Sequence, residues 1–372
     1  MSLPQPPPSS RGPSKKRKFG SGEIPLQDLP YVKEQFSGVV ERLDDLQTVQ
    51  HGKFKDVEEI EVIKIQVQQM LESIDKYADL CKATENTGLD VKSIPFSKFD
   101  DELMRTRLGV SVIDIRCQSA KEFGDNMITA LHLHPLSRQL PDIVNAVGGC
   151  NFQSMSRLLN MISSAVNTKP EASGRMFIDQ WLLESANLTW DLEKGRFHSI
   201  LIPECQISDL RTAPARIIHG RYVTYITGST DYAFWSIPEE RFSVKHEATL
   251  HQNNVINTIT ATLITPFETL VFYEAKRDGE DLTDHVPQVV AQCLAACVKS
   301  KLPQMPFCLT TGSEWMFGIM DTSVTPNTCT KSSVFDVDCR APSLPVIQSI
   351  MTLLLLWTVQ PAMAIRDAIQ KL

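Results

Sequence analysis

The spacing of apolar residues changes near the middle of the chain, from helical steps to short continuous runs. Residues 55–82 carry apolar side chains at successive steps of three and four positions: Ile60, Ile63, Val67, Met70, Ile74, Tyr77 and Cys81. This spacing places them along one face of a helix over three heptads. Further helical patterns at 118–131 and 152–166 predict a helical N-terminal region, which we place at residues 26–168.

The heptad pattern has two interpretations. A seam of this kind pairs the helices of a coiled coil, so residues 57–81 could form a homodimer. However, Val62, Ile65 and Leu71 widen the apolar face. A wider face is typical of a helix that packs on its own domain.

From about residue 170 the pattern predicts an α/β domain, placed at residues 169–325. The predicted helices cover 171–188 and 285–300. Apolar, β-branched runs predict strands at 216–227, 230–236, 269–274, 305–311 and 315–319, with Gly228-Ser229 as the turn between the first two. The order predicts a mixed central sheet flanked by helices. Residues 326–372 are expected to form a loop and a helix that packs on this core.

Composition narrows the class of protein. The chain has 372 residues, 42% of them hydrophobic, and a net charge of −7, which excludes a generally basic nucleic-acid-coating protein. The nine cysteines are spread widely without a CxxC pair, which favours a reducing compartment. The longest apolar stretch, 350–359, is too short to span a bilayer, so no membrane association is expected.

Residues 1–25 are rich in Pro, Ser and Gly, and we expect them to be a disordered tail. The tail contains four consecutive cations, Lys15, Lys16, Arg17 and Lys18. A compact basic run on a flexible tail is what a nuclear import receptor binds, and it could also hold DNA phosphates loosely. The other interpretation is a solvated basic tail. We predict a nuclear protein.

Candidate chemistry falls on the α/β domain. Asp231 follows Gly228-Ser229-Thr230 at the start of a predicted strand, and Glu274 ends an apolar strand with Lys276 two residues later. Residues two apart on a strand point to the same face. Two carboxylates on neighbouring strands suit Mg²⁺ or Mn²⁺, and a lysine beside them can stabilise charge on a phosphate. Gln288 follows on the next helix.

The order of these features resembles the PD-(D/E)XK nuclease superfamily, in particular its RecB-like branch and related restriction-endonuclease-like domains of fungal proteins. The resemblance covers about residues 170–320. It implies that Asp231 and Glu274 bind the metal and that Lys276 and Gln288 complete the catalytic set. Gln292 stands where the family often has a tyrosine. The family's acid on the first helix is Glu171 or Glu184, and Glu171 is favoured because it opens the helix.

The resemblance implies a restriction-endonuclease-like core and a Mg²⁺- or Mn²⁺-dependent nuclease that hydrolyses phosphodiester bonds, with DNA as the expected substrate. The alternative is an inactive nuclease fold that binds nucleic acid or protein. The chain departs from the family in the long interval between Asp231 and Glu274, which an insertion at about 238–266 would explain. Because the domain is acidic overall, a nuclease would need clustered cations, and Arg211, Arg216, His219 and Arg221 lie close in sequence, with Arg277 beside the site. We expect nucleic acid to contact Arg216, Arg221 and Arg277.

The basic run gives the first testable prediction. Replacing Lys15, Lys16, Arg17 and Lys18 with alanine should move a fluorescent fusion out of the nucleus, because the receptor binds the run's charge. The melting temperature should not change, since the tail contributes no core. An unchanged nuclear signal would rule out import through this run.

Overall fold

The computed structural model describes residues 88–166, 171–208, 214–242 and 269–372, with scattered positions between 33 and 71. The basic run and most of the heptad pattern lie outside the described residues. Of the seam, Ile63 and Val67 are described as helical; Ile63 is exposed, whereas Val67 is buried. The predicted insertion also lies mostly outside: β5 ends at Pro238, and β6 begins at Thr269.

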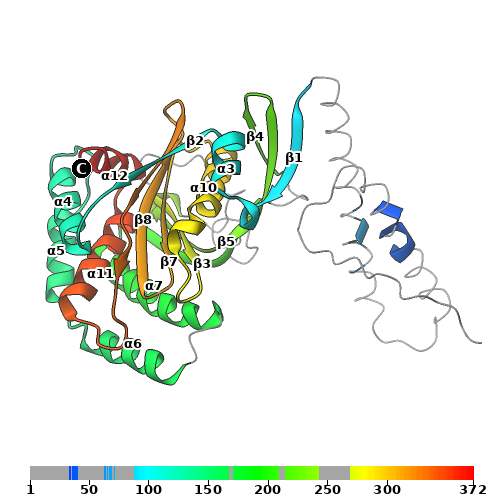
Figure 1. The fold of residues 1–372 in the computed structure, drawn as a ribbon. Coiled ribbons are helices and arrows are strands. Elements are labelled where there is room, and N and C mark those ends of the chain that lie inside the picture. The colour runs from blue at the N-terminus through cyan, green and yellow to red at the C-terminus, as the bar shows by residue number, and fades with distance from the viewer. Residues whose placement is uncertain are drawn as a thin grey trace, which may run out of the picture.

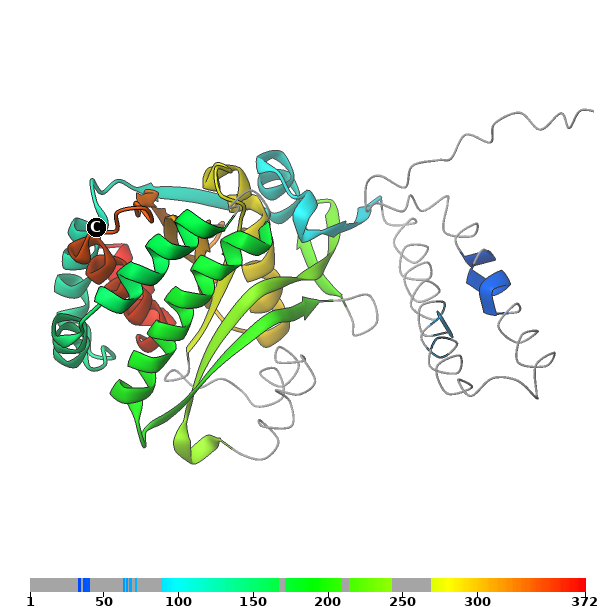
Figure 2. The same cartoon turned by 90° about the horizontal axis from the view of Figure 1, so that it is seen from below.

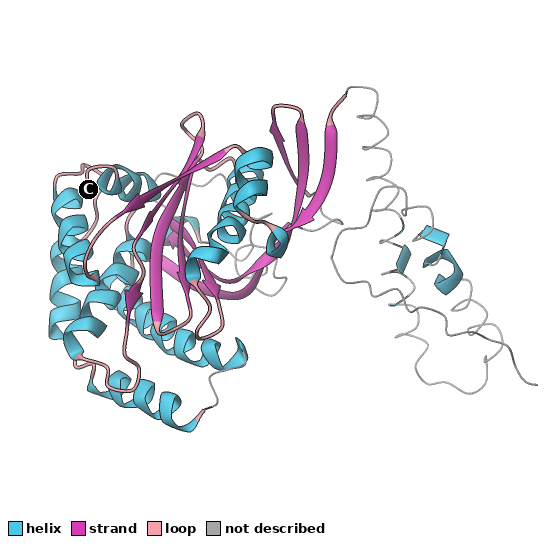
Figure 3. Ribbon diagram, in the orientation of Figure 1, coloured by secondary structure: helices cyan, strands magenta, loops and turns pink. Residues whose placement is uncertain are grey.

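One sheet of ten strands organises the described residues (Figure 1, Figure 3). The strands are β1 (Asp90–Pro95), β2 (Val110–Ile115), β3 (Phe197–Ser208), β4 (Ala215–His219), β5 (Tyr222–Pro238), β6 (Thr269–Ala275), β7 (Gln304–Thr310), β8 (Glu314–Asp321), β9 (Asn327–Ser332) and β10 (Phe335–Asp336). The main path runs β1-β5-β6-β7-β8-β9-β2, with β3 and β4 paired to β5 and β10 to β8. Strands β1, β2 and β7 pair in parallel with their neighbours β5, β9 and β6, and the other pairs are antiparallel. The predicted α/β class with a mixed sheet is confirmed.

Helices cover both faces of this sheet (Figure 1, Figure 2). They are α4 (Ala120–His132), α5 (Leu140–Gly149), α6 (Gln153–Ala165), α7 (Glu171–Glu193), α10 (Val286–Ser300), α11 (Leu344–Val359) and α12 (Ala362–Ile369), with short turns at α3 (Asp101–Leu103), η2 (Phe96–Lys98), η3 (Met104–Leu108), η4 (Glu239–Arg241) and η5 (Leu282–His285). One core lies under α4–α7, α11 and α12, and a second lies under α10. Strand β6 serves both cores: Tyr273 faces the first, and Phe272 faces the second.

The two cores follow from the alternation of side chains between the two faces of central strands that are buried throughout, such as β6 and β7, and from clear helix boundaries. Helix α4 begins after Ser119, whose side chain accepts a hydrogen bond from the Glu122 amide, while Glu122 accepts one from the Gln118 amide. This reciprocal arrangement is a capping box. Helix α10 has Pro287 in its first turn and ends at Lys301 in the left-handed conformation. Among the described residues, no helix is long and apolar enough to cross a membrane.

Most predicted elements are confirmed, but one turn was placed wrongly. The chain reverses at Gly220-Arg221, between β4 and β5, and Gly228-Ser229 lies inside β5. Gly228 is required there by a close approach rather than by a turn, since a Cβ at this position would lie 2.4 Å from the Phe96 ring. In the sequence, a glycine needed for a close approach looks the same as a glycine needed for a turn.

The region 26–168 is not purely helical, contrary to our expectation. Its residues 90–95 and 110–115 form β1 and β2, at the two ends of the sheet path. The segment after residue 325 likewise contributes β9 and β10 in addition to helices. Pairing between strands so distant in sequence leaves no local pattern, which is why the spacing of apolar residues suggested a domain boundary near residue 168.

A buried ion pair ties the end of α7 to the rest of the fold. Glu193, the last residue of α7, is fully buried and lies 3.6 Å from a guanidinium nitrogen of Arg138. Its other oxygen accepts hydrogen bonds from Ser236 on β5 at 2.7 Å and Ser199 on β3 at 3.2 Å. Burial raises the pKa of Glu193, although Arg138 and the two hydroxyls oppose that shift. These contacts set the position of α7 over β3 and β5.

Replacing Arg138 with methionine should therefore lower the free energy of unfolding by about 3 kcal/mol near neutral pH, because it leaves a buried carboxylate without its cation. The loss should shrink as the pH falls below neutral, since burial already raises the pKa of Glu193 and the carboxylate can then become protonated and neutral. Urea unfolding at several pH values measures this. Adding Glu193→Gln to the variant should restore stability, and a failure to do so would show that the lost contact is not electrostatic.

Candidate active site

Asp231 and Glu274 lie where β5 and β6 separate. The last paired residues are Tyr232 and Tyr273, and one step further along this register Asp231 stands opposite Glu274. Beyond that point a side chain takes over from backbone pairing between the two strands: Asp231 Oδ2 accepts a hydrogen bond from the Ala275 amide at 2.7 Å. The predicted pair of carboxylates therefore does come together, but Asp231 lies in the middle of β5 rather than at the start of a strand, beside the end of β6.

Glu274 is buried and surrounded by donors, with 5% of its side chain exposed. Oε1 accepts hydrogen bonds from the Lys276 amine at 2.8 Å and from the Gln288 amide. Oε2 accepts from the Gln292 amide at 2.7 Å and from the Thr230 hydroxyl at 3.4 Å. Such a set stabilises the ionised carboxylate in a buried place.

Lys276 follows the end of β6, and its backbone amide still bonds to Thr310 on β7 at 2.8 Å. Its amine donates to Glu274 Oε1 and to Gln288 Oε1, the latter at 3.0 Å. Only 11% of the side chain is exposed. Lys276, Glu274 and Gln288 thus form a closed triangle, with Gln288 both donating to the glutamate and accepting from the lysine.

Asp231 is held by a cation from the other face of the sheet. Arg175, near the start of α7, donates a hydrogen bond to Asp231 Oδ1. Burial and the charge of Glu274 raise the pKa of Asp231 to about 6, although the Ala275 amide, Arg175 and Lys276 oppose that shift. The charge of Glu274 thus adds to the effect of burial on Asp231 even with the donors in place.

Helix α7 reaches this site because Gly174 lets it approach the sheet closely. A Cβ on Gly174 would lie 3.1 Å from the Lys276 carbonyl oxygen and 3.5 Å from that of Thr311. A larger residue would push the helix away from the strand ends. Gly174 therefore sets how far Arg175 extends over Asp231.

The residues present fit a divalent cation in their chemistry. Asp231 and Glu274 offer hard carboxylate oxygens from two adjacent strands, which is the donor type that Mg²⁺ and Mn²⁺ prefer. A buried amide oxygen, Gln292 Oε1, has no hydrogen-bond partner among the described residues, although its nitrogen donates to Glu274 and to the Ser229 carbonyl. The described residues contain no group of three or more His, Cys, Asp or Glu side chains arranged to hold a metal. A cation here would thus rest on two carboxylates and on non-carboxylate or solvent oxygens.

The two candidates for the first-helix acid lie at different distances along α7. Glu171 opens the helix, in the same first turn as Gly174 and close in sequence to Arg175. Glu184 lies more than three turns further on, near Cys150, whose pKa is raised by burial and by the charge of Glu184. The helix position of Glu171 agrees with the favoured choice, while the position of its side chain lies outside the described residues.

The three arginines expected to bind nucleic acid lie in two places. Arg277 follows Lys276 directly and is 58% exposed, 3.9 Å from Glu280. Arg216 and Arg221 are exposed on the β4–β5 hairpin, where Arg216 is paired with Tyr225. Tyr225 precedes Asp231 by six residues on the same strand, which separates them by about 20 Å. Arg277 therefore borders the site, and the other two lie at a distance along β5.

Sequence reasoning missed the functional position of Arg175 and underrated Gln292. The signal for Gln292 was available, since Gln288 and Gln292 are four residues apart and share one face of a helix. No local signal identifies Arg175, because its contact with Asp231 depends on how α7 crosses the sheet. Glu204 was missed for the same reason: it accepts from the other arm of Arg175 at 3.2 Å.

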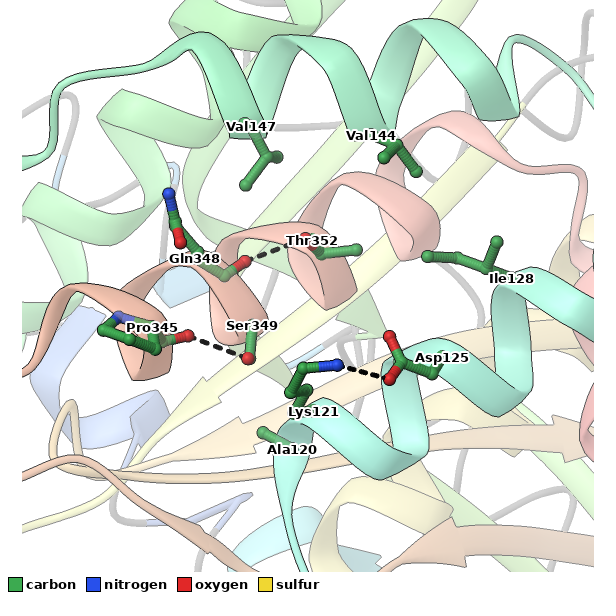
Figure 4. Close-up of a pocket in the computed structure, with 12 residues that line it drawn as sticks. Ala120, Lys121, Asp125, Ile128, Val144, Val147, Pro345, Gln348, Ser349 and Thr352 are labelled. Carbon is green, nitrogen blue, oxygen red and sulfur yellow. Dashed lines mark hydrogen bonds and ion pairs between the residues drawn. The ribbon is translucent and has the colours of Figure 1, made fainter.

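A separate hollow of about 230 Å³ lies between α4, α5 and α11 (Figure 4). Apolar and small residues such as Val144, Val147 and Pro345 form much of its lining. Its two charged lining residues, Lys121 and Asp125, pair with each other at 2.6 Å. It shares no residue with the Asp231–Glu274 site and offers no comparable set of chemical groups.

No protein-family model matches the chain, and no curated protein matches it significantly.

The raised pKa of Asp231 leads to a prediction for the metal-free protein. The folded chain holds this proton up to a pH of about 6, whereas the unfolded chain releases it near 4, so the free energy of unfolding should fall as the pH rises between these values. The contribution is on the order of 2–3 kcal/mol. Urea unfolding in EDTA from pH 4 to 7 measures it.

Asp231→Asn should flatten this part of the pH profile. Asparagine cannot accept hydrogen bonds from both the Ala275 amide and Arg175 as a carboxylate does, so the variant will be less stable at every pH. The test therefore compares the slopes of the free energy of unfolding against pH and not its absolute values. If wild type and Asp231→Asn show parallel profiles, Asp231 keeps an ordinary pKa.

Proposed function

We propose that this protein is a metal-dependent nuclease, which hydrolyses phosphodiester bonds with Mg²⁺ or Mn²⁺ and takes DNA as its substrate. The observation that carries the proposal is that Asp231, Glu274, Lys276 and Gln288, singled out in the sequence by type and order, lie together in one largely buried group: hydrogen bonds join Glu274, Lys276 and Gln288, and Asp231 stands opposite Glu274. Four residues spread over nearly sixty positions share this site because the middle of β5, the end of β6 and the start of α10 meet there.

The order of elements around the site supports the same proposal. Helix α7 is followed by the antiparallel strands β3, β5 and β6, with β4 inserted, and α10 then connects β6 to the parallel strand β7. This order agrees with the resemblance to the PD-(D/E)XK superfamily. A restriction-endonuclease-like core is part of the proposal.

In the proposed reaction Asp231 and Glu274 would hold the cation. When bound, it lowers the pKa of a water molecule and polarises the phosphate. Lys276 is positioned by Glu274 and Gln288 beside the carboxylates, where its amine can stabilise the negative charge that develops on the phosphate. Gln288 fixes the lysine, and Gln292 fixes the opposite oxygen of Glu274.

The alternative is a binding protein that uses the same fold without cleavage. It is favoured by one observation: Arg175 and Lys276 already balance the charges of Asp231 and Glu274. A site whose carboxylates are paired internally is stable without a metal. Nuclear location, an import receptor and a homodimer remain proposals from sequence segments that lie largely outside the described residues.

Calorimetric titration with Mn²⁺, together with cleavage assays on duplex and single-stranded DNA, tests the nuclease. Wild type should bind the ion. Glu274→Gln should lose both binding and cleavage, and it should also lower the free energy of unfolding by about 2–4 kcal/mol because Lys276 loses its buried partner. We expect this loss to outweigh any gain in stability from removing one of two carboxylates that repel each other.

Lys276→Ala should keep Mn²⁺ binding while cleavage falls by about a hundredfold or more, because the lysine acts on the transition state rather than on the ion. Asp125→Asn is the control, since it removes one exposed carboxylate far from the site. A wild-type protein that binds no Mn²⁺ and cleaves neither substrate, yet retains a nucleic acid on a filter, would be the binding protein instead.

A further inference from the structure

We propose that Arg175 is a phosphate-binding residue. In the metal-free site it pairs with Asp231, and a cation that binds Asp231 displaces it toward the substrate. Glu204 is its second anionic partner. This inference rests on the proposed function. It assigns to α7 a role in substrate binding that the sequence motif does not include.

The geometry around Arg175 shows a guanidinium shared between two carboxylates of different kinds. One arm donates to Asp231, whose side chain is 12% exposed, and the other donates to Glu204, whose side chain is 70% exposed. Arg175 itself is 31% exposed. The group therefore lies at the boundary between the buried site and solvent, from where it can reach either side by rotating its side chain.

The backbone at Glu204 supports a functional reason for this contact. Glu204 belongs to β3 and has a φ of +48°, a left-handed conformation that costs energy in a non-glycine residue. Its neighbours Pro203 and Cys205 pair with Tyr232 and Thr230, so Glu204 stands beside Asp231 without pairing. The strain is confined to the one residue of β3 that faces Asp231 and contacts Arg175.

A cation at Asp231 must compete with Arg175. The carboxylate of Asp231 is occupied on one oxygen by Arg175 and on the other by the Ala275 amide. A divalent ion on this carboxylate would face the guanidinium at short range and repel it. Glu204 gives the displaced guanidinium an anionic partner at the rim, so that it stays close to the site instead of moving into solvent.

The same rim is where a phosphate must arrive. A guanidinium can bind a phosphate through two parallel hydrogen bonds. An arginine that lies between a metal-binding carboxylate and solvent is placed to contact an incoming substrate before that substrate reaches the carboxylates. The exposed Arg277, directly after Lys276, adds a second cation at this border. Arg175 would therefore bind the phosphate next to the bond that is cleaved.

Arg175→Ala has opposite effects on metal and on substrate under this proposal. The affinity for Mn²⁺, measured by calorimetry without nucleic acid, should rise by about tenfold, because a competing cation is gone. The affinity for a duplex DNA oligonucleotide in Ca²⁺, measured by fluorescence anisotropy, should fall by about tenfold, because a phosphate contact is lost. Arg175→Lys, which keeps the charge but not the fork, should lie between wild type and Arg175→Ala in both measurements and guards against a folding defect of the alanine variant.

Lys121→Ala is the matched control, since it removes one exposed cation from α4 and should change neither affinity. Glu204 is tested by a double-mutant cycle. Glu204→Gln should weaken Mn²⁺ binding when Arg175 is present and have little effect in the Arg175→Ala background, whereas a general effect of charge would persist in both backgrounds.

An Arg175→Ala protein that binds Mn²⁺ as wild type does, or more weakly, would overturn the proposal and make Arg175 a structural link between α7 and β5. Equal weakening by Glu204→Gln in both backgrounds would overturn the role of Glu204. If wild type itself binds no Mn²⁺, the proposed nuclease fails and the release of Arg175 fails with it. If wild type binds Mn²⁺ and only the Arg175 results differ from expectation, the nuclease proposal stands alone.

Discussion

Two buried carboxylates side by side are the constraint on which the site depends. Removing Asp231 and Glu274 from water is unfavourable unless each has cations or strong donors around it. The fold supplies these from three directions, with Arg175 from α7, Lys276 from the end of β6, and Gln288 and Gln292 from α10. The placement of both helices against the sheet is therefore coupled to the charge of this small group.

The topology explains why such a group can exist at all. Antiparallel pairing of β5 and β6 places Asp231 opposite Glu274, and the crossover through α10 brings its first turns over the end of β6. On the other face, Gly174 and the Arg138–Glu193 pair fix α7 near its two ends. The site is held from both cores of the protein, so its geometry reflects the packing of the whole sheet.

Sequence patterns predict those parts of this arrangement that are local. The helix carrying Gln288 follows from periodicity, and the strand ending in Glu274 and the C-terminal apolar helix follow from continuous apolar runs. Strand β3 was missed because Pro203 and several polar residues interrupt its pattern, and β1 and β2 were missed because their partners lie far away in the sequence. Likewise, the motif identifies Asp231 and Lys276, whereas Arg175 and Glu204 become visible only when α7 and β3 are placed beside β5.

Strands β1 and β2 also determine how the chain can be divided. A fragment starting near residue 169 would contain every candidate catalytic motif, yet it would lack the two strands at the ends of the sheet path. The first half of β5 and the outer side of β9 would then present unpaired backbone donors and acceptors to solvent. Bare edges of this kind pair with other chains, so such a fragment would be prone to aggregate even with every candidate catalytic residue intact.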